Sequence, residues 1–186
     1  MPNEEQNPWQ ITAQRDIYDN PWIQLTEYDV INPGGGKGIY GKVSFKNTAI
    51  GVIPLDEDNN TWIVGQYRFP TDTYSWEIPE GGGAKHETLL EAAHRELLEE
   101  TGLKALRWDK LLEMHLSNSV TDEAAIVYLA RDLSQHEAQP EETESLVVRK
   151  VAFEKAFDMV MRGEIKDAMS VAAVLKLHYL LEQKLI

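Results

Sequence analysis

Residues 81–103 read GGGAKHETLLEAAHRELLEETGL and carry the most informative pattern in the chain. Three consecutive glycines open the segment, and they exclude a helix at that point. From His86 to Thr101 there is no Gly or Pro, and apolar side chains recur at three- and four-residue spacing. This pattern predicts an amphipathic helix of about four turns. Gly102 is well suited to end the helix, since glycine readily adopts the left-handed conformation.

Three glutamates share one face of this predicted helix. Glu96, Glu99 and Glu100 stand at positions i, i+3 and i+4, which span roughly 100° of arc. Like charges this close destabilise a bare helix by roughly a few tenths of a kcal/mol per pair, so an offsetting partner is expected. A divalent cation such as Mg²⁺ is one such partner, because it prefers carboxylate oxygens. The alternative is a solvated acidic face.

The segments around the helix predict the fold class. Four strands are expected before it and three after it, at residues 22–30, 39–45, 49–55, 61–68, 109–116, 124–130 and 146–152. Residues 1–15 are expected to form a short arm, the next two strands a hairpin, and residues 69–86 an ordered loop with a short strand at 75–78. Two closing helices are expected at 153–162 and 167–183. This order predicts an α/β sandwich with a mixed sheet.

Composition limits the functional classes. The 186 residues hold 18 Lys and Arg against 31 Asp and Glu, a formal charge of −13. Such an acidic surface argues against nucleic-acid binding. The absence of Cys excludes disulfides, thiolate nucleophiles and Cys-ligated zinc. We expect no signal peptide and no membrane-spanning segment, and therefore a cytoplasmic protein.

The spacing within residues 81–103 resembles the signature of the Nudix hydrolase family, G-x5-E-x7-R-E-U-x-E-E-x-G-U, where U is aliphatic. The matching positions are Gly81, Glu87, Arg95, Glu96, Leu97, Glu99, Glu100, Gly102 and Leu103. The resemblance implies a Nudix-type α/β/α sandwich whose loop–helix–loop binds Mg²⁺ or Mn²⁺. It also implies hydrolysis of a nucleoside diphosphate linked to another group. The expected domains are residues 1–46, an N-terminal arm and hairpin, and residues 47–186, the hydrolase domain.

The resemblance assigns roles to these residues. Glu96 and Glu100, one turn apart, are the preferred metal ligands, and Glu99 is a third ligand, directly or through water. Arg95 is expected to orient the glutamates. In the segment before the helix, the backbone carbonyl of Glu80 is expected to face the metal. Gly81 and Gly82 would let the backbone come close to an anion.

A second resemblance narrows the subfamily. Residues 66–68 (QYR) and 76–81 (WEIPEG) are similar to segments of ADP-ribose and nucleoside diphosphate sugar pyrophosphatases. In that group the arginine corresponding to Arg68 reaches the diphosphate, a task that suits a bidentate guanidinium. Without the resemblance, Arg68 could equally be a surface residue in an ion pair. Glu77 would either support Arg68 or contact metal.

The general base is left open between two carboxylates. In this subfamily a carboxylate on the loop before the last strand often activates water, which favours Glu142 as base and Glu144 as linked to metal. Glu99 is the alternative base. For Glu142 and Glu144 the alternative is that they are only solvent-exposed acids of a surface loop. Glu123 would either bind the hydroxyl groups of the sugar or cap a turn.

One departure from the resemblance concerns the substrate. ADP-ribose hydrolases of this family tend to carry a proline about 15 residues past the signature, and this chain has none between Pro79 and Pro140. We therefore expect a nucleoside diphosphate sugar, with other sugars at least as favoured as ADP-ribose. A Nudix hydrolase of another class, acting on dinucleoside polyphosphates or nucleoside triphosphates, and a non-catalytic nucleotide-sugar sensor are the alternatives.

The N-terminal hairpin points to self-association. It is too small to be stable alone, and relatives exchange such a segment between subunits. We expect a homodimer with a swapped hairpin, the alternative being a hairpin that folds back on its own chain.

Overall fold

The computed structural model describes residues 6–84, 86–138 and 145–186. Its backbone contacts divide the chain into two units. The first unit comprises the chain up to Lys46 and the distant segment Ser117–Glu123. The second comprises Asn47–Leu116 and Ala124–Ile186 and holds the predicted glutamate helix.

The first unit is a three-stranded antiparallel sheet. Strands β1 (Gln10–Asp19), β2 (Ile23–Ile31) and β3 (Lys37–Phe45) lie in the order β1-β2-β3. The predicted hairpin corresponds to β2 and β3, whose turn contains Gly35 at φ 85°. The expectation of an arm over residues 1–15 was wrong from Gln10 onward. Strand β2 has a second edge, and β1 satisfies the backbone groups along it.

The segment Ser117–Glu123 is bonded to β3 within the same unit. The Val43 N–H donates to the Val120 carbonyl at 2.9 Å, and the Phe45 N–H donates to Asp122 Oδ1 at 3.0 Å. Lys42 Nζ lies 3.1 Å from Asp122 Oδ2. Asp122 therefore ties this loop to the strand through both backbone and charge.

The second unit contains two further sheets. Its strands are β4 (Thr48–Pro54), β5 (Asn60–Arg68), β6 (Thr73–Glu77), β7 (Glu80–Gly83), β8 (Leu103–His115), β9 (Ala124–Gln135) and β10 (Val147–Ala152). One sheet has the order β7-β4-β9-β8 and is mixed, since β4 is parallel to β9 and antiparallel to β7. The other is antiparallel, with the order β10-β5-β6. A short 3-10 turn, Phe69–Thr71, joins β5 to β6.

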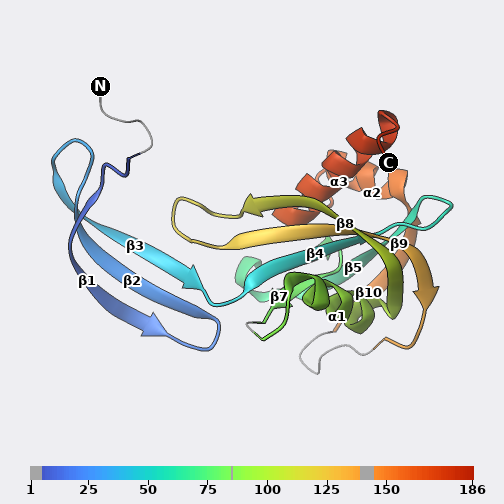
Figure 1. Cartoon of the computed structure of the whole chain (residues 1–186), viewed down its shortest axis with the longest axis horizontal. Helices are drawn as coiled ribbons and strands as arrows, with labels where there is room; N and C mark the ends of the chain where they lie inside the picture. Colours follow the sequence, from blue (N-terminus) through green and yellow to red (C-terminus); the bar gives the residue numbers. More distant parts are fainter. Residues whose placement is uncertain (1–5, 85, 139–144) are drawn as a thin grey trace. The chain divides into compact units, whose positions relative to one another are not determined.

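The described residues of this unit form three helices: α1 (Leu89–Thr101), α2 (Phe153–Met161) and α3 (Ala168–Glu182). Figure 1 shows α1 on one face of the mixed sheet and α2 and α3 on the other. Alternate residues of β4 explain this arrangement. Ile50 and Val52 pack in the cluster with α1, whereas Ile53 packs in the cluster with α2 and α3. The predicted α/β/α sandwich with a mixed sheet is thereby confirmed.

Two local predictions needed correction near the helix. Residues Glu80–Gly83, expected to be loop, form β7 and pair with β4. Glycine suits this strand because α1 packs closely against it. The helix begins at Leu89 rather than His86 because Thr88 and Glu91 form a reciprocal capping box. Among the described residues, no helix combines the length and apolar character needed to cross a lipid bilayer.

Candidate functional site

Helix α1 carries the glutamate stripe at its packed face. Leu97 is fully buried between the helix and the mixed sheet. Its neighbour Glu96 is 7% exposed and Glu100 is 2% exposed. The side chain of Glu99 is more accessible, at 24%. Two of the three predicted ligands are therefore held in the interior, where a carboxylate needs strong partners.

Arg95 supplies several of those partners. Its Nη1 donates to Glu96 Oε1 at 2.8 Å and to Glu99 Oε2 at 2.9 Å. Its Nη2 donates to Glu87 Oε1 at 2.8 Å and to the Gly82 carbonyl at 2.9 Å. The hydrogen bond with Glu87 raises the pKa of Arg95 and lowers the pKa of Glu87. One guanidinium thus fixes two glutamates of α1 and binds the helix to β7.

Strand β7 lies directly against the helix carboxylates. The Glu80 N–H donates to Glu100 Oε2 at 3.0 Å. An added Cβ at Gly81 would overlap the Glu96 carboxylate, so only glycine leaves room there. Gly82 is less restricted, because its added Cβ would meet only the side chain of Asn47, at 3.3 Å.

Arg68 brings a second guanidinium to the site from the end of β5. Its Nε and Nη2 bind the Glu77 carboxylate at 2.6–3.1 Å, and its Nη2 also binds Glu80 Oε1 at 2.5 Å. The pairing of β5 with β6 explains this geometry, since Arg68 and Glu77 lie on the same face of that sheet. Burial lowers the pKa of Arg68, but the bond to Glu77 and the charge of Glu80 more than reverse the effect.

The first turn of α3 adds residues that the sequence analysis missed. Ser170 is fully buried, and its Oγ accepts the Ile78 N–H at 2.9 Å. Asp167 caps α3, its Oδ2 accepting the Ser170 N–H at 2.7 Å. An acid one residue before a helix is a recognisable cap in sequence. The effect of its charge on Glu80 has no sequence signal, because the two residues are far apart along the chain.

The surroundings of Glu80 are strongly negative. Burial, followed by the charges of Asp167 and Glu77, raises the pKa of Glu80 well above its ordinary value. Its Oε2 is buried and has no hydrogen-bond partner among the described residues. A buried carboxylate oxygen of this kind, among other carboxylates, fits a hard divalent cation.

No cation site is complete as the side chains stand. Within residues 6–84, 86–138 and 145–186, no three acidic or histidine side chains are grouped closely enough to hold an ion. Arg68 and Arg95 explain part of this, because they already bind oxygens of several of the glutamates. Binding of a cation would require some of these carboxylates to turn away from the arginines.

The other predicted site residues are placed elsewhere or are not described. Glu123 ends the segment Ser117–Glu123 and belongs to the first unit, whereas the glutamate helix belongs to the second. Glu142 and Glu144 lie outside the described residues. The structure thus brings together Arg68, Glu77, Glu80, Gly81, Gly82, Arg95, Glu96, Glu99 and Glu100.

Two family profiles match the chain. The NUDIX domain matches residues 46–176. The nucleoside diphosphate sugar hydrolase N-terminal domain matches residues 9–43. The boundary between the two matches falls close to the boundary between the two structural units.

Individual proteins agree with the profiles. The chain is 33% identical to an ADP-ribose pyrophosphatase of Mycobacterium tuberculosis, over 93% of this chain and 84% of the relative. It is 32% identical to an ADP-ribose pyrophosphatase of Bacillus subtilis, over 87% and 88% of the two chains. The crystal structure of an ADP compounds hydrolase matches with a TM-score of 0.86, covering 98% of both chains at 19% identity. At that identity the structural match supports the fold alone.

Proposed function

The chain belongs to the Nudix family of pyrophosphohydrolases, and on that premise we propose that it cleaves the diphosphate of a nucleoside diphosphate sugar. The products would be a nucleoside monophosphate and a sugar phosphate. The nucleoside diphosphate sugar hydrolase match to residues 9–43 supports this substrate class over nucleoside triphosphates and dinucleoside polyphosphates.

One observation carries the proposal: the packing of α1 against β7 brings buried carboxylates and an arginine to one place. Glu96 and Glu100 are buried on α1, and Glu80 donates its backbone N–H to Glu100. Arg68 reaches the same Glu80 from the neighbouring sheet. A pure structural role would not need so many charges in the interior, since burying them is costly.

The metal would be Mg²⁺ or Mn²⁺, held by Glu96 and Glu100 with help from Glu99 and Glu80. When bound, it would neutralise the diphosphate and make a water molecule more acidic. Arg95 keeps the carboxylates of α1 in place through its bonds to Glu96 and Glu99.

Arg68 would move from its present carboxylate partners to the diphosphate. Its two bonding nitrogens suit a phosphate as well as they suit Glu77. Glu77, which is 3% exposed, would be the buried carboxylate that holds Arg68 beside the site until substrate binds. The proton of the attacking water would go to a carboxylate. Glu99 is the described candidate because it is the most accessible of the three on α1, and Glu142 remains the other, with Glu144 linked to metal.

The identity of the sugar and base is the finer part of the proposal. Two relatives with the name ADP-ribose pyrophosphatase favour ADP-ribose. The lack of proline between Pro79 and Pro140 favours a different sugar. Hydrolysis of ADP-ribose, ADP-glucose, GDP-mannose and UDP-glucose, compared with and without Mg²⁺, would rank these substrates.

Glutamine variants of α1 test the chemistry directly. Glu99→Gln and Glu100→Gln should keep the fold and lose most turnover, because each keeps its size and removes its charge. Turnover at the wild-type rate in both variants, with Mg²⁺ present, would refute the proposed site. Release of inorganic pyrophosphate from a triphosphate, without cleavage of any diphosphate sugar, would assign the enzyme to another Nudix class.

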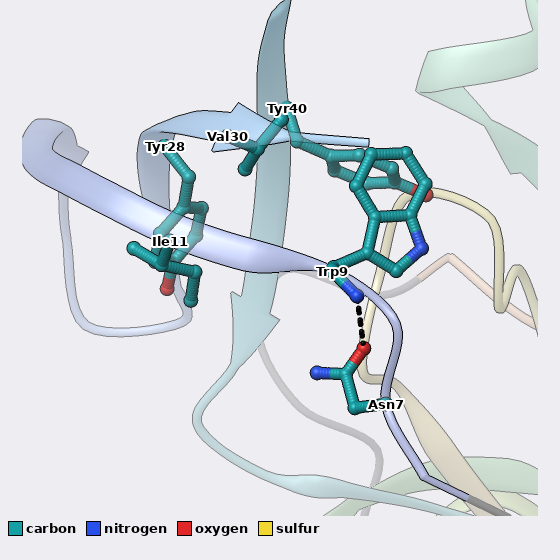
Figure 2. A pocket seen from close by; sticks show the side chains of 6 residues that line it. All are labelled: Asn7, Trp9, Ile11, Tyr28, Val30 and Tyr40. Carbon is teal, nitrogen blue, oxygen red and sulfur yellow. Dashed lines mark hydrogen bonds between the residues drawn. The ribbon is translucent and has the colours of Figure 1, made fainter. Parts of the chain in front are cut away.

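We also propose that the protein forms a homodimer through the first unit. Glu123, in the segment Ser117–Glu123, would bind hydroxyl groups of the sugar. The first unit exposes several large apolar side chains, namely Ile11, Ile17, Trp22 and Ile39. A pocket of about 250 Å³ on this unit is lined by Trp9, Ile11, Tyr28 and Tyr40 among others, and Figure 2 shows how these side chains lie. The rings of Trp9 and Tyr40 meet edge to face, with their centroids 5.3 Å apart. Apolar surface of this kind is typical of an interface. Sedimentation at micromolar concentration should give the dimer mass, and a monomer would contradict the proposal.

A further inference from the structure

Two residues join the two sheets of the second unit, and they stand between two acids of the candidate site. Glu77 ends β6 of the antiparallel sheet, and Glu80 begins β7 of the mixed sheet. Ile78 and Pro79 therefore form the crossover between the sheets. Glu77 and Glu80 both bind Nη2 of Arg68, at 2.6 and 2.5 Å. The path of the crossover thus sets where these two carboxylates hold the guanidinium.

The backbone of the crossover is fixed from two sides. The Ile78 N–H donates to Ser170 Oγ of α3 at 2.9 Å, and the Pro79 carbonyl accepts the Val52 N–H of β4 at 2.8 Å. Because proline has no N–H, the Ile78 N–H is the one backbone donor that the two crossover residues offer. The peptide bond is planar, so the bond to Ser170 orients the whole peptide unit between Glu77 and Ile78. Ser170 is fully buried and Ile78 is 2% exposed, so bulk water cannot replace this bond.

Apolar packing alone does not explain a serine at this position. The Ile78 side chain already packs against α3, in one buried cluster with Met169 and Val174. Alanine in place of Ser170 would keep that packing, whereas a buried hydroxyl is costly unless it is hydrogen-bonded. The Ser170 N–H donates to Asp167 Oδ2 at 2.7 Å, which holds the serine in the first turn of α3. The serine therefore supplies what packing lacks, a directional bond to the crossover.

We propose that Ser170 is a positioning residue for Arg68, acting through the Glu77–Ile78 peptide and the Glu77 carboxylate. This inference rests on the proposed hydrolase function, because Arg68 is the group assigned there to the diphosphate. Nε and Nη2 of Arg68 bind Glu77 at 2.6–3.1 Å, so a turn of the peptide that carries Glu77 moves the guanidinium with it. An arginine held farther from the diphosphate loses binding energy in the ground state and the transition state alike, which raises KM and leaves kcat nearly unchanged.

The test is steady-state hydrolysis of the best nucleoside diphosphate sugar by the full-length protein with Mg²⁺. Ser170→Ala should raise KM about tenfold and change kcat less than about threefold, because it releases the peptide and leaves α1 intact. Ser170→Thr keeps the hydroxyl and should keep the wild-type KM, even if its extra methyl group lowers the midpoint of urea unfolding. Ser170→Cys has a weaker acceptor and should raise KM in the same direction as alanine. Calorimetry with the same compound in EDTA, where no turnover occurs, should show the same changes in Kd.

Two controls separate positioning from a general loss of stability. Val174→Ala removes buried volume from the same helix and leaves the bond between Ile78 and Ser170 in place. It should lower the midpoint of urea unfolding and keep the wild-type KM. In an Arg68→Lys background, Ser170→Ala should change KM less than about twofold, since the guanidinium through which it acts is gone.

The results distinguish the inference from the proposed function. A KM raised by Ser170→Ala, but not by Ser170→Thr or Val174→Ala, supports the inference. A wild-type KM in Ser170→Ala, an equal rise in Val174→Ala, or the full rise in the Arg68→Lys background overturns the inference and leaves the hydrolase function intact. Failure of the wild-type protein to cleave any nucleoside diphosphate sugar with Mg²⁺ overturns both.

Discussion

The contact between Gly81 and Glu96 makes the sharpest prediction about this site. Gly81 has no positive φ, so alanine fits the backbone of β7. The cost of Gly81→Ala comes from the side chain, because the new Cβ overlaps the Glu96 carboxylate. Ordinary contact begins at 3.4 Å, and reaching it would require the carboxylate to retreat by about 1 Å. That retreat weakens the 2.8 Å bond from Arg95 Nη1 to Glu96 Oε1.

The magnitudes follow from this geometry. A hydrogen bond to a charged group contributes about 1.5–3 kcal/mol. Replacement of glycine returns about 0.4–1 kcal/mol by restricting the unfolded chain. We therefore expect Gly81→Ala to lower the free energy of unfolding by about 1–2 kcal/mol. Because Glu96 is a predicted metal ligand, a shift of this size should also lower turnover about a hundredfold.

The assays are urea unfolding and hydrolysis of the best substrate with Mg²⁺. Gly82→Ala is the control for stability, since its Cβ meets only the Asn47 side chain, which can turn away. It should unfold within about 0.5 kcal/mol of the wild type. If Gly81→Ala matched the wild type in both stability and turnover, the close packing of β7 on α1 could not be what positions Glu96.

Three further predictions concern the second unit. Ser170→Ala should lower the free energy of unfolding by about 1–3 kcal/mol, because it leaves the buried Ile78 N–H without its acceptor; a loss too small to measure in urea would contradict that bond. For Asp56, burial raises the pKa, but the bonds from Lys150 and Asn60 outweigh it and lower the pKa from 3.8 to about 2. Its carboxylate therefore stabilises the fold above pH 3.8, and this contribution is lost as the pH falls towards 2. Asp56→Asn should cost about 1–2 kcal/mol at pH 7 and nearly nothing at pH 2, and an equal cost at both values in urea would refute the assignment. Removal of divalent cations with EDTA should abolish turnover and lower the melting temperature, since the carboxylates around Glu80 then repel one another, and Mn²⁺ should restore both; a melting temperature unchanged by EDTA and Mn²⁺ would argue against a cation at this place.

The elements that sequence could predict are those whose pattern is local. The helix ending at Thr101 and its stripe of three glutamates follow from a 3.6-residue period, which needs no information from elsewhere in the chain. The strands over residues 49–55 and 61–68 were likewise recognisable from their branched and aromatic residues. The match of residues 81–103 to the Nudix signature identified the family for the same reason.

Features that depend on distant pairing were missed or assigned differently. Strand β1 forms because β2 has an open edge, and β7 forms because three glycines allow α1 to pack against a strand that pairs with β4. In neither case do the residues of the strand reveal the neighbouring strand with which it pairs. Glycine has a low propensity for strands, so the three consecutive glycines by themselves predicted a loop.

The candidate site likewise combines residues that local spacing predicts with residues that only the tertiary structure brings together. Its α1 carboxylates lie within one turn of helix and could be named from spacing alone. The rest of the site comes from other elements: Arg68 meets Glu77 through the β5–β6 pairing, and the Glu80 N–H reaches Glu100 through the packing of β7 against α1. Hydrogen bonds within a helix connect residues four apart, so sequence spacing reports them. Burial and charge between separate elements depend on how the whole second unit packs, and that packing is what joined five acids and two arginines into one site.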